Sequence, residues 1–272
     1  MSLITITQSM GCMGDAIAKL VAERLNLELY DDARLQRTLQ GIGRDLADLK
    51  DFDERAPGFF DRLLGNKPDI FLDLMEAVIY EVAKKGEGVI IGHGGQYLLR
   101  DFGCALHVLI YAERSTRIRY AMEQEGISRE VAERLIRQSD DNQAGYFRFA
   151  FHRDWNDLSL FDLVVSSEKM SAPSAADIIV AAAQNQEMKT CSLTALDAMD
   201  RLSLEKKVEA ALLNSNFDPR YIHLAVPDKG VVLVKGLTES EENLRRLEAV
   251  VGEVDGVDQV RCQVSVRPAV LI

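Results

Sequence analysis

Short apolar runs alternate with helical patterns over the first two thirds of the chain. The runs predict strands at Leu3–Thr7, Leu27–Tyr30, Val89–Ile91, Leu106–Tyr111 and Leu160–Val165. The spacing of apolar positions between them predicts helices at Asp15–Leu25, Arg114–Glu125, Arg129–Ala144 and Ser174–Gln186, and over a long region from Ala33 to Lys85. Strands that are apolar throughout and alternate with helices are typical of a buried parallel sheet. The pattern therefore predicts an α/β fold, with a five-stranded parallel sheet and helices on both faces.

The pattern changes after residue 186. Residues 187–200 are expected to form a linker, and residues 201–268 a second, smaller domain. Its predicted elements are a helix at Leu204–Leu213, strands at Tyr221–Val226 and Val231–Lys235, a helix at Glu239–Val251 and a strand at Gln259–Val266. The sequence Pro227-Asp-Lys-Gly230 between the first two strands is a turn signal. An α-β-β-α-β order predicts a small α+β domain with its helices on one face of the sheet.

The stretch from Leu3 to Asp32 carries the clearest chemistry. A strand, a turn with Gly11 and Gly14, and a helix start follow one another. Free backbone N–H groups and the helix dipole make such a corner a site for anions. The full phosphate-loop signature requires a lysine and a hydroxyl after the second glycine. Here Asp15 and Ala16 stand at those positions, so a phosphate site and a structural turn without a ligand are both left open.

Two further groups are expected at the same edge of the sheet, because ligands of parallel sheets lie beyond the carboxyl ends of the strands. These are Asp31-Asp32 and Gly92-His93-Gly94. Two polar segments, 51–58 and 137–148, are expected to act as lids above this edge, and the second has an arginine at each end. Arginine-bearing lids suit a reaction that must exclude water while a phosphoryl group moves. The alternative is a solvated helix face with ordinary surface arginines.

Composition limits the classes of function. The chain has 272 residues, 47% of them hydrophobic, and a net charge of −11, which argues against a protein built to bind nucleic acid or anionic membranes. The four cysteines form no close pair, so neither a zinc site nor a disulfide is indicated, and reduced thiols are expected. We expect no export signal and no transmembrane segment, and therefore a cytoplasmic location.

The first 185 residues resemble the cytidylate kinase-like family of nucleoside monophosphate kinases. The resemblance is carried by several short blocks, which are Ile4–Thr7 with Gly11 and Gly14, Leu29–Asp32, Asp53–Gly58, Val89–Gly94, Glu125–Glu130, Asp154–Asp157 and Phe161–Val165. It implies a P-loop kinase fold that binds ATP and Mg²⁺ at the glycine turn and a CMP-type acceptor opposite.

The resemblance also implies roles for individual residues. Gly11, Cys12, Met13 and Gly14 would form the phosphate turn, with Asp15 and Ala16 beginning the helix. Asp32, Arg55 and His93 would lie on the acceptor side. Arg137 and Arg148 would be lid cations that stabilise the transferring phosphoryl group. No metal-ligating residue is carried over.

Departures from the family pattern weaken this assignment. The family often has a basic residue where Asp15 stands and an arginine where His93 stands, and its lid is richer in arginine. Loss of one such stabilising group costs about 3–4 kcal/mol, by analogy with the loss of one oxyanion-hole donor. A carboxylate at the same position is expected to increase this cost.

Residues 200–268 resemble a BON domain, through Leu204–Leu213, the Val226–Gly236 hairpin and Val254–Val260. BON domains are associated with phospholipid or ligand binding, so a phospholipid or a protein is an expected partner of this module. Three hypotheses follow for the whole chain. It is a kinase that phosphorylates CMP or a related nucleotide, a degenerate kinase fold that senses a nucleotide or phosphate, or a structural protein with two interaction domains.

Overall fold

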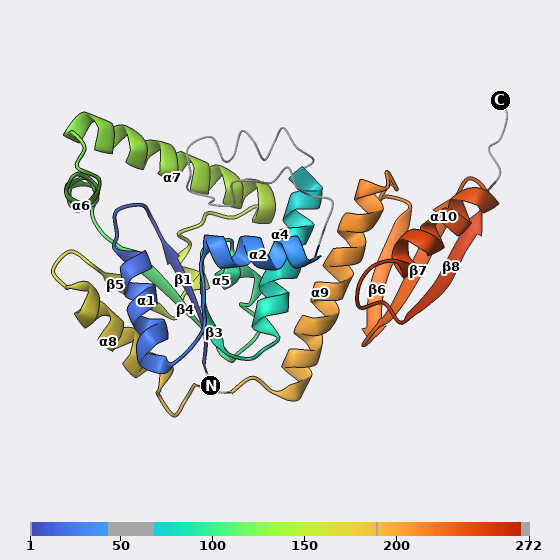
Figure 1. Cartoon of the computed structure of the whole chain (residues 1–272), viewed down its shortest axis with the longest axis horizontal. Coiled ribbons are helices and arrows are strands. Elements are labelled where there is room, and N and C mark those ends of the chain that lie inside the picture. Colours follow the sequence, from blue (N-terminus) through green and yellow to red (C-terminus); the bar gives the residue numbers. More distant parts are fainter. Residues whose placement is uncertain (1, 43–67, 189, 268–272) are drawn as a thin grey trace.

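The computed structural model describes residues 2–42, 68–188 and 190–267. Its first domain is built on a parallel sheet of five strands in the order β2-β3-β1-β4-β5 (Figure 1). The strands are β1 (Leu3–Gln8), β2 (Leu29–Tyr30), β3 (Gly88–Ile91), β4 (Ala105–Tyr111) and β5 (Leu163–Ser166). All four pairings are parallel, which confirms the predicted α/β class and places every strand's carboxyl end at one edge.

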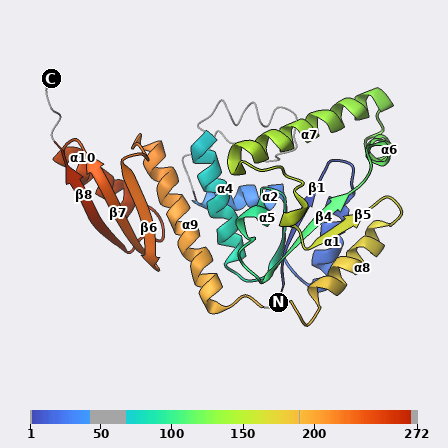
Figure 2. The same cartoon turned by 180° about the vertical axis from the view of Figure 1, so that it is seen from behind.

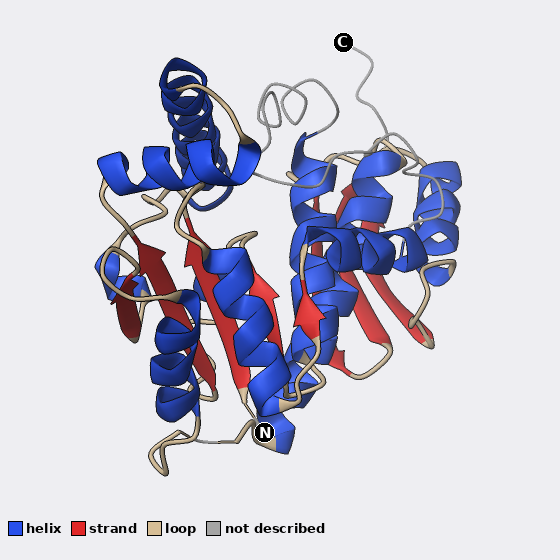
Figure 3. Cartoon of the chain, turned by 60° about the vertical axis from the view of Figure 1, so that its left-hand side comes forward, coloured by secondary structure: helices blue, strands red, loops and turns tan. Residues whose placement is uncertain are grey.

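Helices cover both faces of this sheet (Figure 3). On one face α1 (Gly14–Leu25) packs against α8 (Ala172–Ala183). The other face is covered by α2 (Asp32–Ile42), α4 (Pro68–Ala83), α5 (Gly95–Leu98) and the end of α7 (Arg129–Phe151). The short α6 (Arg114–Glu125) packs against the beginning of α7.

Alternation along the strands divides the core into two layers. Leu3 of β1 and Ile90 of β3 contribute to the layer beneath α4 and α7, whereas Ile4 and Ile6 contribute to the layer beneath α1 and α8. Successive side chains of a strand point to opposite faces, so an all-apolar run is what a sheet covered on both sides requires.

The second domain has a sheet of three strands in the order β6-β7-β8. Strands β6 (Ile222–Asp228) and β7 (Val231–Thr238) are antiparallel, and β8 (Gln259–Val266) runs parallel to β7. Helix α10 (Glu241–Gly252) contributes Leu247 and Val251 to a core that also contains Val232 and Val234 of β7. The predicted small α+β domain is confirmed.

Helix α9 (Leu193–Asn214) joins the two domains. It begins inside the segment that was expected to be a linker, and the predicted helix 204–213 is only its second half. Figures 1 and 2 show α9 standing between the first domain and the β6-β7-β8 sheet. Met199 and Ala210 lie in the core of the first domain, whereas Leu204 and Val208 lie in the core of the second.

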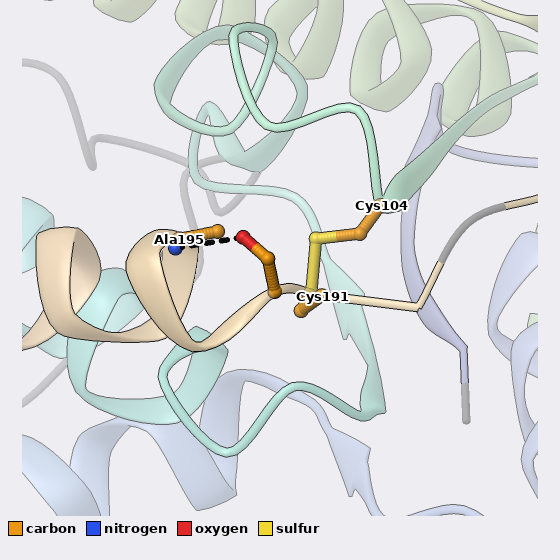
Figure 4. The surroundings of a disulfide bond; sticks show 4 residues. Cys104, Cys191 and Ala195 are labelled. Atoms are coloured by element: carbon orange, nitrogen blue, oxygen red, sulfur yellow. Dashed lines mark hydrogen bonds between the residues drawn. A yellow bond between two sulfur atoms is a disulfide. The ribbon is translucent and has the colours of Figure 1, made fainter.

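A disulfide joins Cys104, just before β4, to Cys191, just before α9 (Figure 4). The expectation of four reduced cysteines is therefore wrong. The two residues are 87 positions apart in sequence, but their Cα atoms lie 4.9 Å apart. The bond ties the beginning of the connecting helix to the central sheet. Cys12 and Cys262 are free thiols.

A polar contact between α4 and α9 accompanies the apolar one. Lys206 of α9 pairs with Asp73 at 3.2 Å and Glu76 at 3.1 Å, both on α4, and with Glu209 at 2.8 Å. Burial raises the pKa of Asp73 to about 7 and also raises the pKa of Glu76. Burial opposes the charge on Lys206, but attraction to Glu76 and Asp73 prevails and raises the lysine's pKa.

Lys206 thus forms ion pairs with three carboxylates at the interface between α4 and α9.

Within the described ranges, no helix combines the length and the apolar character that crossing a bilayer requires.

Candidate functional site

The glycine turn after β1 is shaped by close packing against α6. Gly11 has φ +84°, and a Cβ at this position would lie 2.7 Å from the backbone carbonyl oxygen of Arg117. A residue with a side chain would be strained by both its backbone conformation and this contact. Met13, at the N-cap of α1, also has a left-handed conformation and makes no side-chain cap hydrogen bond. The backbone geometry of an anion-binding corner is therefore present.

Two side chains from the elements that flank the turn meet at this corner. The Gln8 amide Nε2 donates to Asp15 Oδ1 at 2.7 Å. Gly14 leaves room for the Gln8 side chain, which occupies the position that a Cβ on residue 14 would need. Asp15 lies in the first turn of α1, where a carboxylate interacts favourably with the helix dipole. The turn thus carries a negative charge beside the corner where a phosphate would bind.

Arg117 of α6 holds the turn from the other side. Its Nε donates to the Met10 carbonyl at 2.8 Å, and its two terminal nitrogens donate to Asp140 of α7 at 3.0 and 2.6 Å. The residue is only 7% exposed. A bidentate pair of this kind is strong, so the guanidinium charge next to the turn is already matched by a carboxylate.

The segment predicted as an arginine-bearing lid, 137–148, is the regular middle of helix α7. Ser128 caps this helix, its side chain accepting a hydrogen bond from the Val131 amide. The buried stripe of α7 contains Ser139, Gln143, Tyr146 and Phe147, and Gln143 Nε2 donates to the Gln8 carbonyl at 3.1 Å. A glutamine amide, which carries no charge, is therefore the α7 side chain that contacts the end of β1.

Arg137 and Arg148 are both exposed. Arg148 pairs with Asp154 at 3.4 Å, and it lines an open cavity of about 580 Å³ with His152 and Arg153 at the end of α7. In this structure neither predicted lid cation is among the buried residues of α7.

On the acceptor side, the structure brings two of the predicted residues together. His93 Nε2 and Asp32 Oδ1 are 2.6 Å apart, and the His93 side chain is fully buried. His93 follows Gly92 in a turn with positive φ values and leads into α5. Asp32 is the first residue of α2. Arg55 lies outside the described residues.

Cys12 is buried within the turn. Burial raises the pKa of its thiol above the ordinary value, although the nearby Arg117 acts in the opposite direction. A thiol with a raised pKa is protonated at neutral pH and is a poor nucleophile. Cys12 is therefore a small packing residue of the turn.

The turn does not fit ATP and Mg²⁺ in the manner of a complete phosphate loop. Asp15 and Ala16 supply neither the lysine nor the hydroxyl that such a loop uses. Asp15 would add repulsion toward a polyphosphate. No cluster of metal-binding side chains occurs among the residues that the structure describes.

Four residues of this site were not found from the sequence. Gln8, Arg117, Asp140 and Gln143 come from three different elements, and they meet only through the packing of α6 and α7 over the turn. Gln8 alone carried a local signal, since it is a polar residue that ends a buried strand next to the glycine turn.

Comparisons with known proteins agree with this architecture. The model of the cytidylate kinase-like family matches residues 3–169, and that of the BON domain matches residues 200–268. A protein of Pyrobaculum islandicum named cytidylate kinase is 28% identical over 174 residues, which are 63% of this chain and 86% of that protein. One of the same name from Methanocaldococcus jannaschii is 24% identical over 186 residues, 67% of this chain and 98% of that protein. A solved structure of an uncharacterised protein from Eubacterium ventriosum has a TM-score of 0.53 and 24% identity, covering 66% of this chain and 97% of its own.

Proposed function

Because the chain belongs to the cytidylate kinase-like family and ends in a BON domain, we propose that its kinase-like domain is a catalytically degenerate module. In this proposal it binds a ligand of the nucleotide type without transferring a phosphoryl group. The observation that carries the proposal is the hydrogen bond between Gln8 and Asp15 across the glycine turn.

Phosphoryl transfer depends on positioning and on neutralising the charge that develops on the phosphoryl group. At this turn the expected cation is replaced by Asp15, and the charge of Arg117 is already paired with Asp140. Each missing charge stabiliser costs about 3–4 kcal/mol, or a factor of 10²–10³ in rate. Asp15, His93 and the uncharged Gln143 together would therefore lower turnover by several factors of ten.

Through the BON domain, ligand binding to the kinase-like domain could change the contact with a partner. Helix α9 belongs to both cores, and Ser203 of α9 donates to the Ala77 carbonyl of α4 at 3.1 Å. A shift of α4 on ligand binding would therefore be passed to the β6-β7-β8 sheet. We propose that this sheet carries the contact with a protein or phospholipid partner.

The sequence predicts a cytoplasmic location for the protein. The Cys104–Cys191 disulfide argues against that location, because structural disulfides are more usual in oxidising compartments.

The alternative is an active kinase that uses ATP and Mg²⁺ to phosphorylate CMP or a related nucleotide. It is favoured by the names of the relatives from Pyrobaculum islandicum and Methanocaldococcus jannaschii, which are called cytidylate kinase. The two functions are separated by incubating the protein with ATP, Mg²⁺ and each nucleoside monophosphate and measuring ADP. We expect no ADP above the rate without protein, and sustained turnover would establish the alternative.

A charge-reversal variant tests whether Asp15 closes the phosphate corner. We expect Asp15→Lys to tighten ATP binding at least tenfold in calorimetry, because it removes a repulsive charge and restores an attractive one. Glu23→Lys is the matched control, since it makes the same change of net charge at an exposed position near the other end of α1. Equal effects of the two variants would show that the turn is not a phosphate site.

A further inference from the structure

A cavity of about 380 Å³ lies where α4, α9 and the beginning of β6 meet. Figures 1 and 2 show α9 standing between α4 and β6. The volume is near the lower end of the range for cavities that bind small organic molecules. No residue of the glycine turn lines this cavity, so it is separate from the candidate site described above.

Part of the cavity lining is apolar. It includes Leu213 of α9, Phe217 in the segment after α9 and Leu224 of β6, and all three are half-buried. Leu213 packs against the core of the first domain, whereas Phe217 and Leu224 pack against the core of the second. Because removing apolar surface from water is favourable, these side chains would hold the apolar part of a ligand.

The rest of the lining is acidic. Asp69 and Asp73 come from α4 and Glu209 from α9, and no lysine or arginine is among the described residues that line the cavity. Asp218 also lines it, but its carboxylate pairs with Arg220 at 2.6 Å. The cavity therefore combines an apolar surface with carboxylates, and its lining offers them no lysine or arginine of its own.

The contacts of Lys206 show which cation suits these carboxylates. Its Nζ lies 3.2 Å from Asp73, 3.1 Å from Glu76 and 2.8 Å from Glu209, which is the contact distance of an ammonium group with its three donors. One ammonium against three carboxylates leaves an excess of negative charge. The Asp73 side chain is only 15% exposed, so water screens this excess weakly. A second ammonium group in the cavity would meet Asp73, Glu209 and Asp69, and it would reduce the excess.

We propose that this cavity binds a primary ammonium group on an apolar stem, with Asp73 and Glu209 contacting the ammonium and Leu213, Phe217 and Leu224 covering the stem. Two sources share this chemistry, a free alkylamine and a lysine side chain of a partner protein. The inference is independent of the proposed function, because it concerns a different cavity and holds whether or not the first domain transfers a phosphoryl group.

Calorimetry with the full chain at pH 8 compares hexylammonium, hexanol, hexanoate and methylammonium. Hexylammonium is expected to bind at least ten times more tightly than hexanol or hexanoate, because only it pairs with the carboxylates. It is also expected to bind at least ten times more tightly than methylammonium, since each buried methylene contributes about fourfold. Nα-acetyl-lysine methylamide distinguishes the two sources. Affinity equal to that of hexylammonium assigns the cavity to a partner's lysine, and much weaker affinity assigns it to a free amine.

Two variants show whether Asp73 contacts the ligand. Asp73→Asn keeps the shape of the side chain and removes its charge, and we expect the affinity for hexylammonium to fall at least tenfold. Asp197→Asn makes the same change of net charge at an exposed position of α9 that does not line the cavity, and it is expected to keep full affinity. Thermal unfolding without ligand verifies that both variants fold. If Asp73→Asn does not fold, Glu209→Gln is measured instead, with an expected loss of at least fivefold.

Three results would overturn the inference. The first is no binding of hexylammonium at about 10 mM, a concentration at which a well-matched ligand of this size is detected. The second is equal affinity for hexylammonium and hexanol, which would show an apolar cavity that does not recognise charge. The third is an affinity that is unchanged in Asp73→Asn, or that falls equally in Asp73→Asn and Asp197→Asn, since the carboxylates of the cavity would then have no specific role.

Discussion

Replacing Asp73 at the contact between α4 and α9 should make the stability of the protein less dependent on pH. Burial raises the pKa of Asp73 from 3.8 to about 7, while Lys206 acts in the opposite direction. The side chain is 15% exposed, so solvent screens it weakly. Because the folded-state pKa is above the unfolded one, the unfolded chain releases this proton first as the pH rises. Asp73 therefore costs stability progressively between about pH 4 and pH 7.

The magnitude follows from the two pKa values. A difference of about 3 units corresponds to about 4 kcal/mol at and above pH 7, and about 1–2 kcal/mol of this is already present at pH 5. Asn at this position cannot ionise. The stability of Asp73→Asn relative to the natural chain is therefore expected to increase by about 2–3 kcal/mol between pH 5 and pH 8.

Urea unfolding followed by circular dichroism at pH 5, 6, 7 and 8 measures this difference, in which the titrating groups that lie away from Asp73 cancel between the two proteins. Asp197→Asn, an exposed carboxylate on α9, is the control and should show no comparable trend. A difference that stays flat or falls with pH would refute the reasoning. It would mean that attraction to Lys206, and not burial, determines the state of Asp73.

Two further predictions concern the covalent and backbone constraints. Reduction of the Cys104–Cys191 bond, or replacement of both residues by Ser, should lower the free energy of unfolding by up to about 4–5 kcal/mol, since the bond closes a loop spanning 87 positions. Reductant should have no effect on the double Ser variant, and an unchanged Tm on reduction of the natural chain would show that the bond does not form. Gly11→Ala should cost about 2 kcal/mol, because of its φ of +84° and the contact of its new Cβ with the Arg117 carbonyl. Gly103→Ala, where a Cβ meets nothing within 4 Å, should be neutral, and equal stability of the two Ala variants would contradict the packing described here.

The sheet could be predicted from sequence because its strands are apolar throughout. Ile4, Ile6 and Ile90 are buried whichever face they point to, so each run is visible without knowledge of its neighbours. The interpretation of residues 137–148 as a lid arose for the opposite reason. Ser139 and Gln143 are polar residues on its buried stripe, and their polarity made this part of the helix resemble a solvated lid.

The first half of α9 escaped prediction because apolar residues lie on two sides of the helix. Met199 faces one core and Leu204 the other, so no single apolar face appears and the helix resembles an irregular segment. The Cys104–Cys191 pair is invisible for a related reason. Its two residues meet only when α9 docks, and no local spacing reports a contact between segments so far apart.

The candidate site was predicted in part. The glycine turn, Asp15 and the pair of Asp32 with His93 could be located because each lies within or directly after a predicted strand. The hydrogen-bond partner of Asp15 could not be located from the sequence, since the Gln8 side chain reaches Asp15 by passing over Gly14. The positions of Arg137 and Arg148 on α7 depend on the rotation of a helix, which sequence pattern alone does not fix when the buried stripe is polar.

The two modules of this protein have become inseparable through α9. Cutting the chain at residue 200, where the match to the BON domain begins, would divide the helix after its second turn and remove the part of the first domain's apolar cover that Leu202, Ala210 and Leu213 provide. Each fragment would then expose an apolar surface that is prone to aggregation.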